Sequence, residues 1–224
     1  MLITGASTGI GAATARQAVA AGWQVVLGAR GEERLRSLAE SLGGEEVALF
    51  RRCDVADWDD QQQLVRLALD GFGGLDAVFA NAGFGAKRGF LEASVEHWKA
   101  MIDTNVLGTA LSIRAGLPVF REQGRGQFVL TSSVAGRRAL PGSLYAATKH
   151  AVTAMGEALR QEVSDSDIKV TLIEPGLVDT PFFEDRPTGA LEADDIAGAV
   201  MWAMTQPRGV DVNEVLIRPV RQAT

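Results

Sequence analysis

A tyrosine and a lysine four positions apart are the residues best suited to proton transfer in this chain. Tyr145 is the only tyrosine, and Lys149 is one of four lysines among 224 residues, so chance alone gives this spacing about once in fifty. On a helix, side chains at i and i+4 share a face, which would place the ammonium beside the phenol. A nearby cation favours the phenolate and lowers the pKa of a tyrosine toward the neutral range. The pair therefore indicates an acid–base group, with a structural cation–phenol contact as the alternative.

Two serines follow an apolar run that is expected to be a strand. Ser132 and Ser133 come directly after residues 127–131. In open α/β sheets ligands bind at the carboxyl ends of the strands, so a hydroxyl here could hold a substrate carbonyl. Serines at strand ends are also common turn formers, which is the alternative.

A glycine-rich turn, TGASTGIG, joins the first expected strand to the first expected helix. Gly5, Gly9 and Gly11 would let the chain turn sharply and let a pyrophosphate approach the backbone. The helix that follows would direct amide donors and its positive dipole end at the anion. The spacing G-x3-G-x-G differs from the more common G-x-G-x-x-G fingerprint. In its strand–helix context the turn predicts a nucleotide-binding site, and an ordinary tight turn is the alternative.

The end of the second expected strand bears on which dinucleotide would bind. Ala29 stands 18 positions after Gly11, close to where an acidic residue would bind the ribose 2′-hydroxyl of NAD. Alanine cannot do so, whereas Arg30, the next residue, offers a planar fork of donors to a 2′-phosphate. We therefore predict NADP rather than NAD, with a solvated arginine before a charged helix as the alternative.

Alternating strands and helices must position these residues. Short apolar runs alternate with stretches of helical period, which predicts βαβ units and a parallel sheet buried on both faces. Pro118 falls inside one expected helix and should bend or end it, which would divide that stretch into two helices. The expected strands are residues 1–4, 24–29, 48–54, 77–80, 127–131, 169–174 and 212–217, and the expected helices are residues 10–21, 32–42, 59–72, 95–123, 145–163 and 193–204.

Composition limits the classes of partner. The 22 Lys and Arg residues against 28 Asp and Glu residues give a net charge of −6, which offers no general electrostatic reason to bind nucleic acid or an anionic membrane. No run approaches the roughly 18 to 20 apolar residues needed to cross a bilayer. Cys53 is the only cysteine, so neither an intramolecular disulfide nor a cysteine metal cluster is expected. We expect a cytoplasmic protein without a metal, nucleic-acid or membrane partner.

Seven short motifs occur together in one order: TGASTGIG, CDV, NAG, TNVLG, SSVAG, YAATK and EPGLVDT. By these motifs the chain resembles the short-chain dehydrogenase/reductase family over its whole length. The resemblance implies a single Rossmann-type α/β domain over residues 1–224, with about seven parallel strands in the order 3-2-1-4-5-6-7 and helices on both faces.

The same resemblance implies an activity. Members of the family transfer a hydride between NADP(H) or NAD(H) and a carbonyl or secondary alcohol, so a small carbonyl or alcohol compound is the expected substrate. A non-catalytic NADP(H)-sensing protein on the same fold is the alternative, because fold alone does not fix function. The helices at 95–123 and 145–163 match those through which family members form dimers and tetramers, so a homo-oligomer is expected.

The resemblance also implies roles for individual residues. Tyr145 would be the acid–base group, and Lys149 would lower its pKa and bind the nicotinamide ribose. Ser133, directly before VAG, would orient and polarise the carbonyl. It precedes Tyr145 by twelve residues, one fewer than is common in the family, so Ser132 remains an alternative. Asn105 would hold a water that links the lysine to solvent.

The residues implied to contact the cofactor lie in six segments of the chain. Asp54 and Val55 would lie beside the adenine, although turn chemistry explains them as well, and Asp57 is the expected N-cap of the third helix. The full set is Gly5, Ser7, Thr8, Gly9, Ile10, Gly11, Arg30, Asp54, Val55, Asn81, Ala82, Gly83, Tyr145, Lys149, Pro175, Gly176, Val178 and Thr180.

The chain departs from the family pattern in two places. Only three residues precede the glycine turn, so the first strand is either short or begins upstream. The segment at about 180–192 is short where many relatives carry a helical lid over the substrate, which suggests an open site or a small substrate. Phe182 and Phe183 in this segment would either close the pocket or pack on the sheet edge.

Two further features concern the substrate class. Arg137 and Arg138 would either attract a substrate carboxylate or form a solvated face. The stretches MIDTN and IEPGLV and the tail VNEVLIRPVRQAT are similar to the NADP-dependent 3-hydroxy acid and serine dehydrogenases. This likeness favours 3-hydroxy acids, with small ketones and aldehydes as the alternative.

Overall fold

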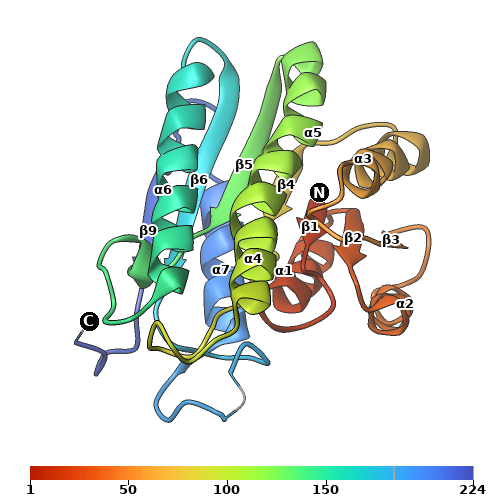
Figure 1. Cartoon of the computed structure of the whole chain (residues 1–224). Coiled ribbons are helices and arrows are strands. Elements are labelled where there is room, and N and C mark those ends of the chain that lie inside the picture. Colours follow the sequence, from red (N-terminus) through yellow and green to blue (C-terminus); the bar gives the residue numbers. More distant parts are fainter. Residues whose placement is uncertain (184, 224) are drawn as a thin grey trace.

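A seven-stranded parallel sheet forms the centre of the computed structural model, which describes residues 1–183 and 185–223 (Figure 1). The strands lie in the order β3-β2-β1-β4-β5-β6-β9, so the predicted doubly wound order is confirmed, with β9 as the seventh strand. They are β1 (Leu2–Thr4), β2 (Val25–Ala29), β3 (Ala48–Arg52), β4 (Ala77–Ala80), β5 (Arg125–Thr131), β6 (Asp167–Pro175) and β9 (Glu214–Ile217). β1 is short, as expected, yet it pairs with β2 on one side and β4 on the other.

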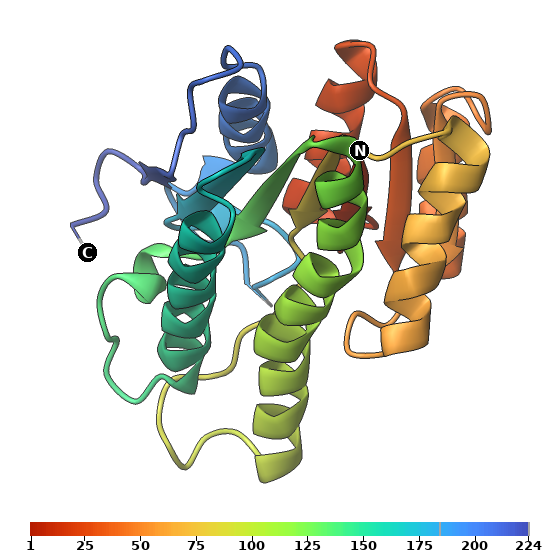
Figure 2. The ribbon, with the colours of Figure 1, turned by 90° about the horizontal axis from the view of Figure 1, so that it is seen from above.

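Helices cover both faces of this sheet. One face packs against α1 (Gly9–Ala20), α2 (Glu32–Ser41) and α7 (Ala193–Met204), and the other against α3 (Trp58–Phe72), α5 (Gly108–Gln123) and α6 (Leu144–Glu162). Figure 2 shows the sheet between α1 and α7 on one side and α5 and α6 on the other. Successive strand residues serve opposite faces, as Leu2 and Ile3 do, which is why the strands are apolar without a break.

The expected helix at 95–123 is interrupted, but not at its proline. α4 (Val95–Ile102) passes into α5 through a π-helical turn, η1 (Asp103–Leu107), while Pro118 lies inside α5. Of the two outcomes predicted for Pro118, a bend or an end of the helix, the end does not occur, and the stretch is divided into two helices at η1 instead. A proline removes one helical hydrogen bond, and here the buried residues Ala115 and Phe120 on either side hold the helix against the sheet.

Two elements near the carboxyl edge of the sheet escaped the sequence pattern because each has only two residues. β7 (Val178–Asp179) and β8 (Leu191–Glu192) pair with each other in a separate small sheet and bracket the short segment after β6. The expected cap of α3 is confirmed, since the Asp57 side chain accepts the Asp60 amide at 2.9 Å. Across the described residues, no helix combines the length and apolarity that crossing a membrane requires.

Candidate active site

A cavity of about 820 Å³ opens at the carboxyl edge of the sheet. Residues that follow β1, β2, β3, β4, β5 and β6 line it, because all of these strands are parallel and end at the same edge. The cavity is lined by every residue expected to be catalytic or to bind the cofactor, except Gly11 and Asn105. The sheet thus brings together segments that are far apart in the sequence.

The glycine turn forms one wall of this cavity. Gly5 and Gly9 have φ angles of 65° and 53°, a region that favours glycine. Gly11 faces the carbonyl oxygen of Gly5 so closely that a Cβ there would clash with it. α1 begins at Gly9, and its N-cap Thr8 makes no side-chain cap hydrogen bond, so the first amides of the helix stay available to an anion.

Asn81 ties three strand ends together beneath the cavity. Its amide nitrogen donates to the Thr4 carbonyl at 3.2 Å, and its amide oxygen accepts the Thr131 hydroxyl at 3.2 Å. The Thr4 hydroxyl in turn accepts the backbone amides of Asn81 and Ala82 at 3.0 and 3.2 Å. These bonds join the ends of β1, β4 and β5 and fix the height of the cavity floor.

Tyr145 and Lys149 lie on one face of α6, as their spacing predicts. Ser143 caps this helix by accepting the Ala146 amide at 3.2 Å, which places Tyr145 in its first turn. The Lys149 ammonium donates to the Thr131 carbonyl at 2.7 Å and lies 5.7 Å from the centre of the Tyr145 ring. The Ser133 hydroxyl lies near the Tyr145 phenol and lowers its pKa, against the effect of burial. A hydroxyl, a phenol and an ammonium therefore meet at one point of the cavity.

Burial dominates the protonation of both titratable groups. It raises the pKa of Tyr145 to about 12, and the Ser133 hydroxyl opposes this shift. The expectation that Lys149 draws the pKa of the phenol toward neutrality is thus not met in this structure. Burial also lowers the pKa of Lys149 to about 8, because an ammonium loses hydration inside the protein. At neutral pH the phenol holds its proton and the lysine its charge.

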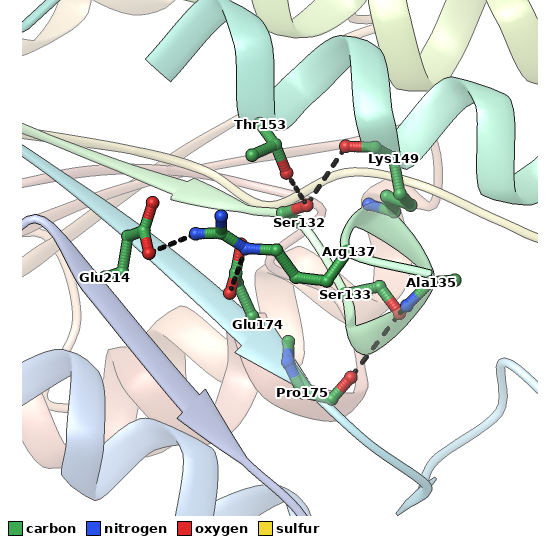
Figure 3. A network of polar contacts seen from close by, with 9 residues as sticks. All are labelled: Ser132, Ser133, Ala135, Arg137, Lys149, Thr153, Glu174, Pro175 and Glu214. Atoms are coloured by element: carbon green, nitrogen blue, oxygen red, sulfur yellow. Dashed lines mark hydrogen bonds and ion pairs between the residues drawn. The ribbon is translucent and has the colours of Figure 1, made fainter. Parts of the chain in front are cut away.

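The two consecutive serines point to different surroundings (Figure 3). The Ser132 hydroxyl donates to the Lys149 carbonyl at 3.1 Å and contacts the Thr153 hydroxyl at 2.8 Å, away from the phenol. The Ser133 hydroxyl accepts the Ala135 amide at 3.1 Å and also reaches the Pro175 carbonyl at 3.4 Å. Ser133 is therefore the serine that can face a ligand beside Tyr145, while Ser132 is held within the protein.

Asn105 lies at the centre of the π-helical turn and is fully buried. Its side chain donates to the Phe84 carbonyl at 2.9 Å and to the Thr148 hydroxyl at 3.0 Å, and it accepts the Phe84 amide at 3.0 Å. Gly83 lies between Asn105 and Lys149, since a Cβ on it would be 3.1 Å from the Asn105 amide oxygen and 3.5 Å from the lysine nitrogen. Both protons of its amide nitrogen are thus engaged, and its backbone carbonyl accepts the Thr109 hydroxyl at 2.8 Å.

The short segment after β6 covers the Tyr145 end of the cavity. Phe182 and Phe183 both line the cavity, and the Phe182 ring meets the Tyr145 ring edge-on at 5.5 Å. Thr180 lies against the glycine turn, 3.2 Å from where a Cβ of Gly9 would be. Of the two arrangements weighed for the phenylalanines, the structure has the one in which they close the pocket. Glu184 lies outside the described residues.

The two neighbouring arginines that follow the serines, Arg137 and Arg138, make different contacts. Arg137 forms ion pairs with Glu174, at 2.7 Å, and with Glu214, so two carboxylates engage its guanidinium although the side chain is 35% exposed. Arg138 lines the cavity.

Sequence reasoning missed two cavity-lining arginines, Arg34 and Arg88. Arg34 follows Arg30 by four residues in the sequence GEER, so the spacing of basic residues could have indicated it. Arg88 lies in a loop whose place over the cavity no local pattern reveals.

Comparison with known proteins agrees with this geometry. The family model described as short chain dehydrogenase matches residues 1–190. An uncharacterized oxidoreductase of Staphylococcus aureus is 37% identical over 223 residues, covering 98% of this chain and 96% of the relative.

Solved structures with the same fold include an alcohol dehydrogenase from Thermococcus sibiricus complexed with 5-hydroxy-NADP, with 32% identity, a TM-score of 0.91 and coverage of 100% of this chain and 97% of that one. Serine dehydrogenase from Escherichia coli gives 32% identity, a TM-score of 0.91 and coverage of 100% and 99%. Of other similar structures, one is complexed with NADP+ and one with NAD. The chain belongs to the short-chain dehydrogenase/reductase family and is an oxidoreductase of that family.

Proposed function

We propose that this oxidoreductase transfers a hydride between NADP(H) and a carbonyl or secondary alcohol of a small molecule. The observation that carries the proposal is the meeting of Ser133, Tyr145 and Lys149 in one cavity that is also lined by the glycine turn. The reaction requires a carbonyl held beside a proton donor, and these are the groups that can provide it.

In the proposed reaction Ser133 hydrogen-bonds the substrate carbonyl and Tyr145 donates the proton to its oxygen. A bound nicotinamide supplies the hydride. Because the pKa of Tyr145 is about 12, the phenol is protonated at neutral pH and ready to donate. The reverse reaction needs the phenolate, so carbonyl reduction is the direction that this protonation state favours near neutrality.

Lys149 and Asn105 support the proton donor. The ammonium of Lys149 lies over the phenol ring and stabilises the negative charge that develops on it after proton transfer. It would also bind the nicotinamide ribose. Asn105 would hold the water through which the proton is replaced from solvent. The buried π-helical turn at Asp103–Leu107 supports this role because it brings Asn105 behind Gly83 and close to Lys149.

The cavity fits a dinucleotide with an extra phosphate. The turn at Gly5, Ser7 and Thr8 and the start of α1 would hold the pyrophosphate. Arg30 and Arg34 line the end of the cavity beside β2, where a 2′-phosphate would be, and no acidic residue stands at position 29. Two guanidinium groups at this place support NADP over NAD.

Charge at the other end supports an acidic substrate. Arg88 and Arg138 line the cavity there, and Asp54, which follows β3, is the only acidic residue among the described residues that line it. In a chain of net charge −6 this excess of cations indicates an anionic ligand. We therefore propose 3-hydroxy acids and their 3-oxo forms as the substrate class, with Arg138 as the group that holds the carboxylate, and small ketones and aldehydes as the second candidate.

We also propose a cytoplasmic homo-oligomer. The helices expected at the interface expose apolar side chains, with Val95, Ile102 and Leu107 between 42% and 56% exposed. Covering such side chains with a second copy would remove apolar surface from water. Light scattering that gives a monomer at working concentration would refute the oligomer.

The first experiment is NADPH oxidation by the purified protein with a panel of aldehydes, ketones and 3-oxo acids, with Tyr145→Phe alongside. We expect turnover that falls at least about a hundredfold in the variant, because a positioned proton donor contributes that much or more, while NADPH binding is retained. NADPH binding without turnover on any compound would instead favour an NADP(H)-sensing protein.

A further inference from the structure

One buried carboxylate, that of Glu174, takes no part in the proposed reaction. Glu174, near the end of β6, is 1% exposed. The Arg137 side chain donates from Nε to both of its oxygens, at 2.7 and 2.9 Å, and the same guanidinium pairs with Glu214 on β9 (Figure 3). A charge is rarely buried this completely unless it is paired and hydrogen-bonded.

A chain of hydroxyl groups connects this carboxylate to the helix that carries Tyr145. The hydroxyl of Thr153 on α6 lies near the Glu174 carboxylate and lowers the pKa of this group, while burial, the larger effect, raises it. The Thr153 hydroxyl also contacts the Ser132 hydroxyl at 2.8 Å, and Ser132 reaches the Lys149 carbonyl at 3.1 Å. One polar network therefore joins the end of β6, the loop after β5 and the α6 backbone between Tyr145 and Thr153.

The charge of Glu174 sets the direction of the hydrogen bonds in this network. A carboxylate can only accept, so Thr153 must donate to it and is left with lone pairs for Ser132. The single Ser132 proton is then shared between two acceptors, the Thr153 oxygen and the Lys149 carbonyl oxygen, and both contacts hold the Ser132 side chain against α6. A neutral amide in place of the carboxylate could donate as well as accept, and the direction would no longer be fixed.

The backbone at Gly136 packs closely against this network. Gly136 lies against it, since a Cβ there would be 2.8 Å from the Thr153 hydroxyl and 2.9 Å from the Lys149 carbonyl, and would clash with the Ser132 hydroxyl. The Ser132 amide also donates to the Ile173 carbonyl of β6 at 2.8 Å. The Ser132 amide is bound to β6 and the Ser132 hydroxyl to α6. These bonds also fix the position of Ser133, the next residue.

We propose that Glu174, with Arg137 as its partner, is a positioning residue that sets the place of Ser133 relative to Tyr145 through Thr153 and Ser132. The consequence for turnover rests on the proposed function, whereas the consequence for the geometry of the phenol does not. Misplacing a reacting group by about 1 Å can cost about a hundredfold in rate.

The test compares two variants that break the network with two that do not. Glu174→Gln removes the charge, and Thr153→Val removes the hydroxyl at nearly constant shape. Thr153→Ser restores the hydroxyl. Glu162→Gln is the matched control, because it makes the same change at the far end of α6 in an exposed ion pair with Arg121.

The chain has one tyrosine, so protein labelled with ¹³Cζ-tyrosine gives one NMR signal that reports on the phenol without any turnover. We expect Glu174→Gln and Thr153→Val to shift this signal, and Thr153→Ser and Glu162→Gln to leave it in place. With a turned-over substrate, kcat should fall about tenfold or more in the two network variants, because the reacting groups are misplaced. The Kd and KM for NADPH should stay within about twofold, since the glycine turn is untouched.

A tyrosine signal that stays in place in both network variants would overturn the proposal, whether or not turnover is detected. Equal losses in Thr153→Ser and Thr153→Val would also overturn it, because only the latter lacks the hydroxyl. If Glu174→Gln does not fold, the two Thr153 variants decide alone. Failure of the proposed function would appear differently, as absence of turnover in the unmodified protein.

Discussion

The two ends of the cavity are built from different kinds of structure. At the Arg30 end the lining comes from turns that directly follow β1, β2 and β3, and the backbone of the glycine turn supplies the groups that face a ligand. At the Phe182 end the lining comes from three longer segments that follow β4, β5 and β6. Two of these are joined by the Gly89 amide, which donates to the Gly142 carbonyl at 2.8 Å.

This difference in construction corresponds to two proposed tasks, cofactor binding at the Arg30 end and substrate binding at the Phe182 end. The sheet fixes the position of strand ends, so the cofactor end tolerates little change and its motifs are easy to recognise. Loops carry side chains that can vary without disturbing the core, so we expect the end proposed to bind the substrate to define specificity. Ser133, Tyr145 and Lys149 lie where the two ends meet, and variants at the three places should therefore change different kinetic constants.

The largest effect on the kinetic constants is expected at Ser133, which lies where the two ends of the cavity meet. Ser133→Ala removes the donor to the substrate carbonyl and should lower kcat about a hundredfold, as loss of one such donor does, with little change in the KM for NADPH. Ser132→Ala acts only through the network and should lower kcat about tenfold. Steady-state kinetics on the best substrate measures both, and a larger loss in Ser132→Ala would reverse the assignment of the two serines.

At the cofactor end, Arg30→Ala should raise the KM for NADPH about ten- to thirtyfold, because a charge-assisted hydrogen bond contributes about 1.5 to 2 kcal/mol. The KM for NADH and the KM for the substrate should not change. An Arg30→Ala protein that keeps its preference between NADPH and NADH would contradict the proposed 2′-phosphate site.

At the substrate end, Arg138→Gln should raise the KM for a 3-oxo acid about tenfold and leave the KM for an uncharged ketone unchanged, since only the former loses a charged partner. The KM for NADPH serves as the internal control. Equal effects on both substrates would mean that Arg138 does not hold a carboxylate. The same change at Arg137 should instead destabilise the fold, because Glu174 would be buried without its cation.

The pH dependence of carbonyl reduction should follow the lysine rather than the tyrosine. Lys149 is charged below its pKa of about 8 and neutral above it, while Tyr145 keeps its proton up to about 12. The rate should therefore be steady below pH 8 and fall severalfold as the pH rises through 8, where the ammonium is lost. A profile of kcat/KM that stays flat well beyond this point would show that the charge of Lys149 is not needed.

The smallest effect is expected away from both ends. Asp57→Ala removes the side-chain cap of α3 and should lower the free energy of unfolding by about 1 kcal/mol. The kinetic constants should not change, because α3 lies behind the sheet rather than along the cavity. Chemical denaturation measures the loss of stability. A change in the KM for NADPH or for the substrate would show that the cavity depends on the stability of α3.

Local chemistry accounts for what the sequence predicted well. The helices and the cap at Asp57 follow from patterns within a few residues, and so does the shared face of Tyr145 and Lys149, whereas the strand order followed from the family resemblance. Where the prediction failed, the cause was not local. Pro118 was expected to bend or end its helix, and the helix does not end there, because burial of its neighbours on the sheet outweighs one lost hydrogen bond. The pKa of Tyr145 was expected to fall beside a lysine, but burial raises it.

The sequence by itself determined the elements of this protein, the family to which it belongs and the residue types that meet in the cavity, because these depend on periodicity, on glycine turns and on motifs of a few residues. Only the tertiary structure decided which of two adjacent serines faces the phenol and which of two adjacent arginines faces the cavity. Ser132 is held by α6, and Arg137 by a glutamate 37 residues further along the chain. Neighbours in sequence point in different directions, and the partners that separate them come from elements that only folding brings together.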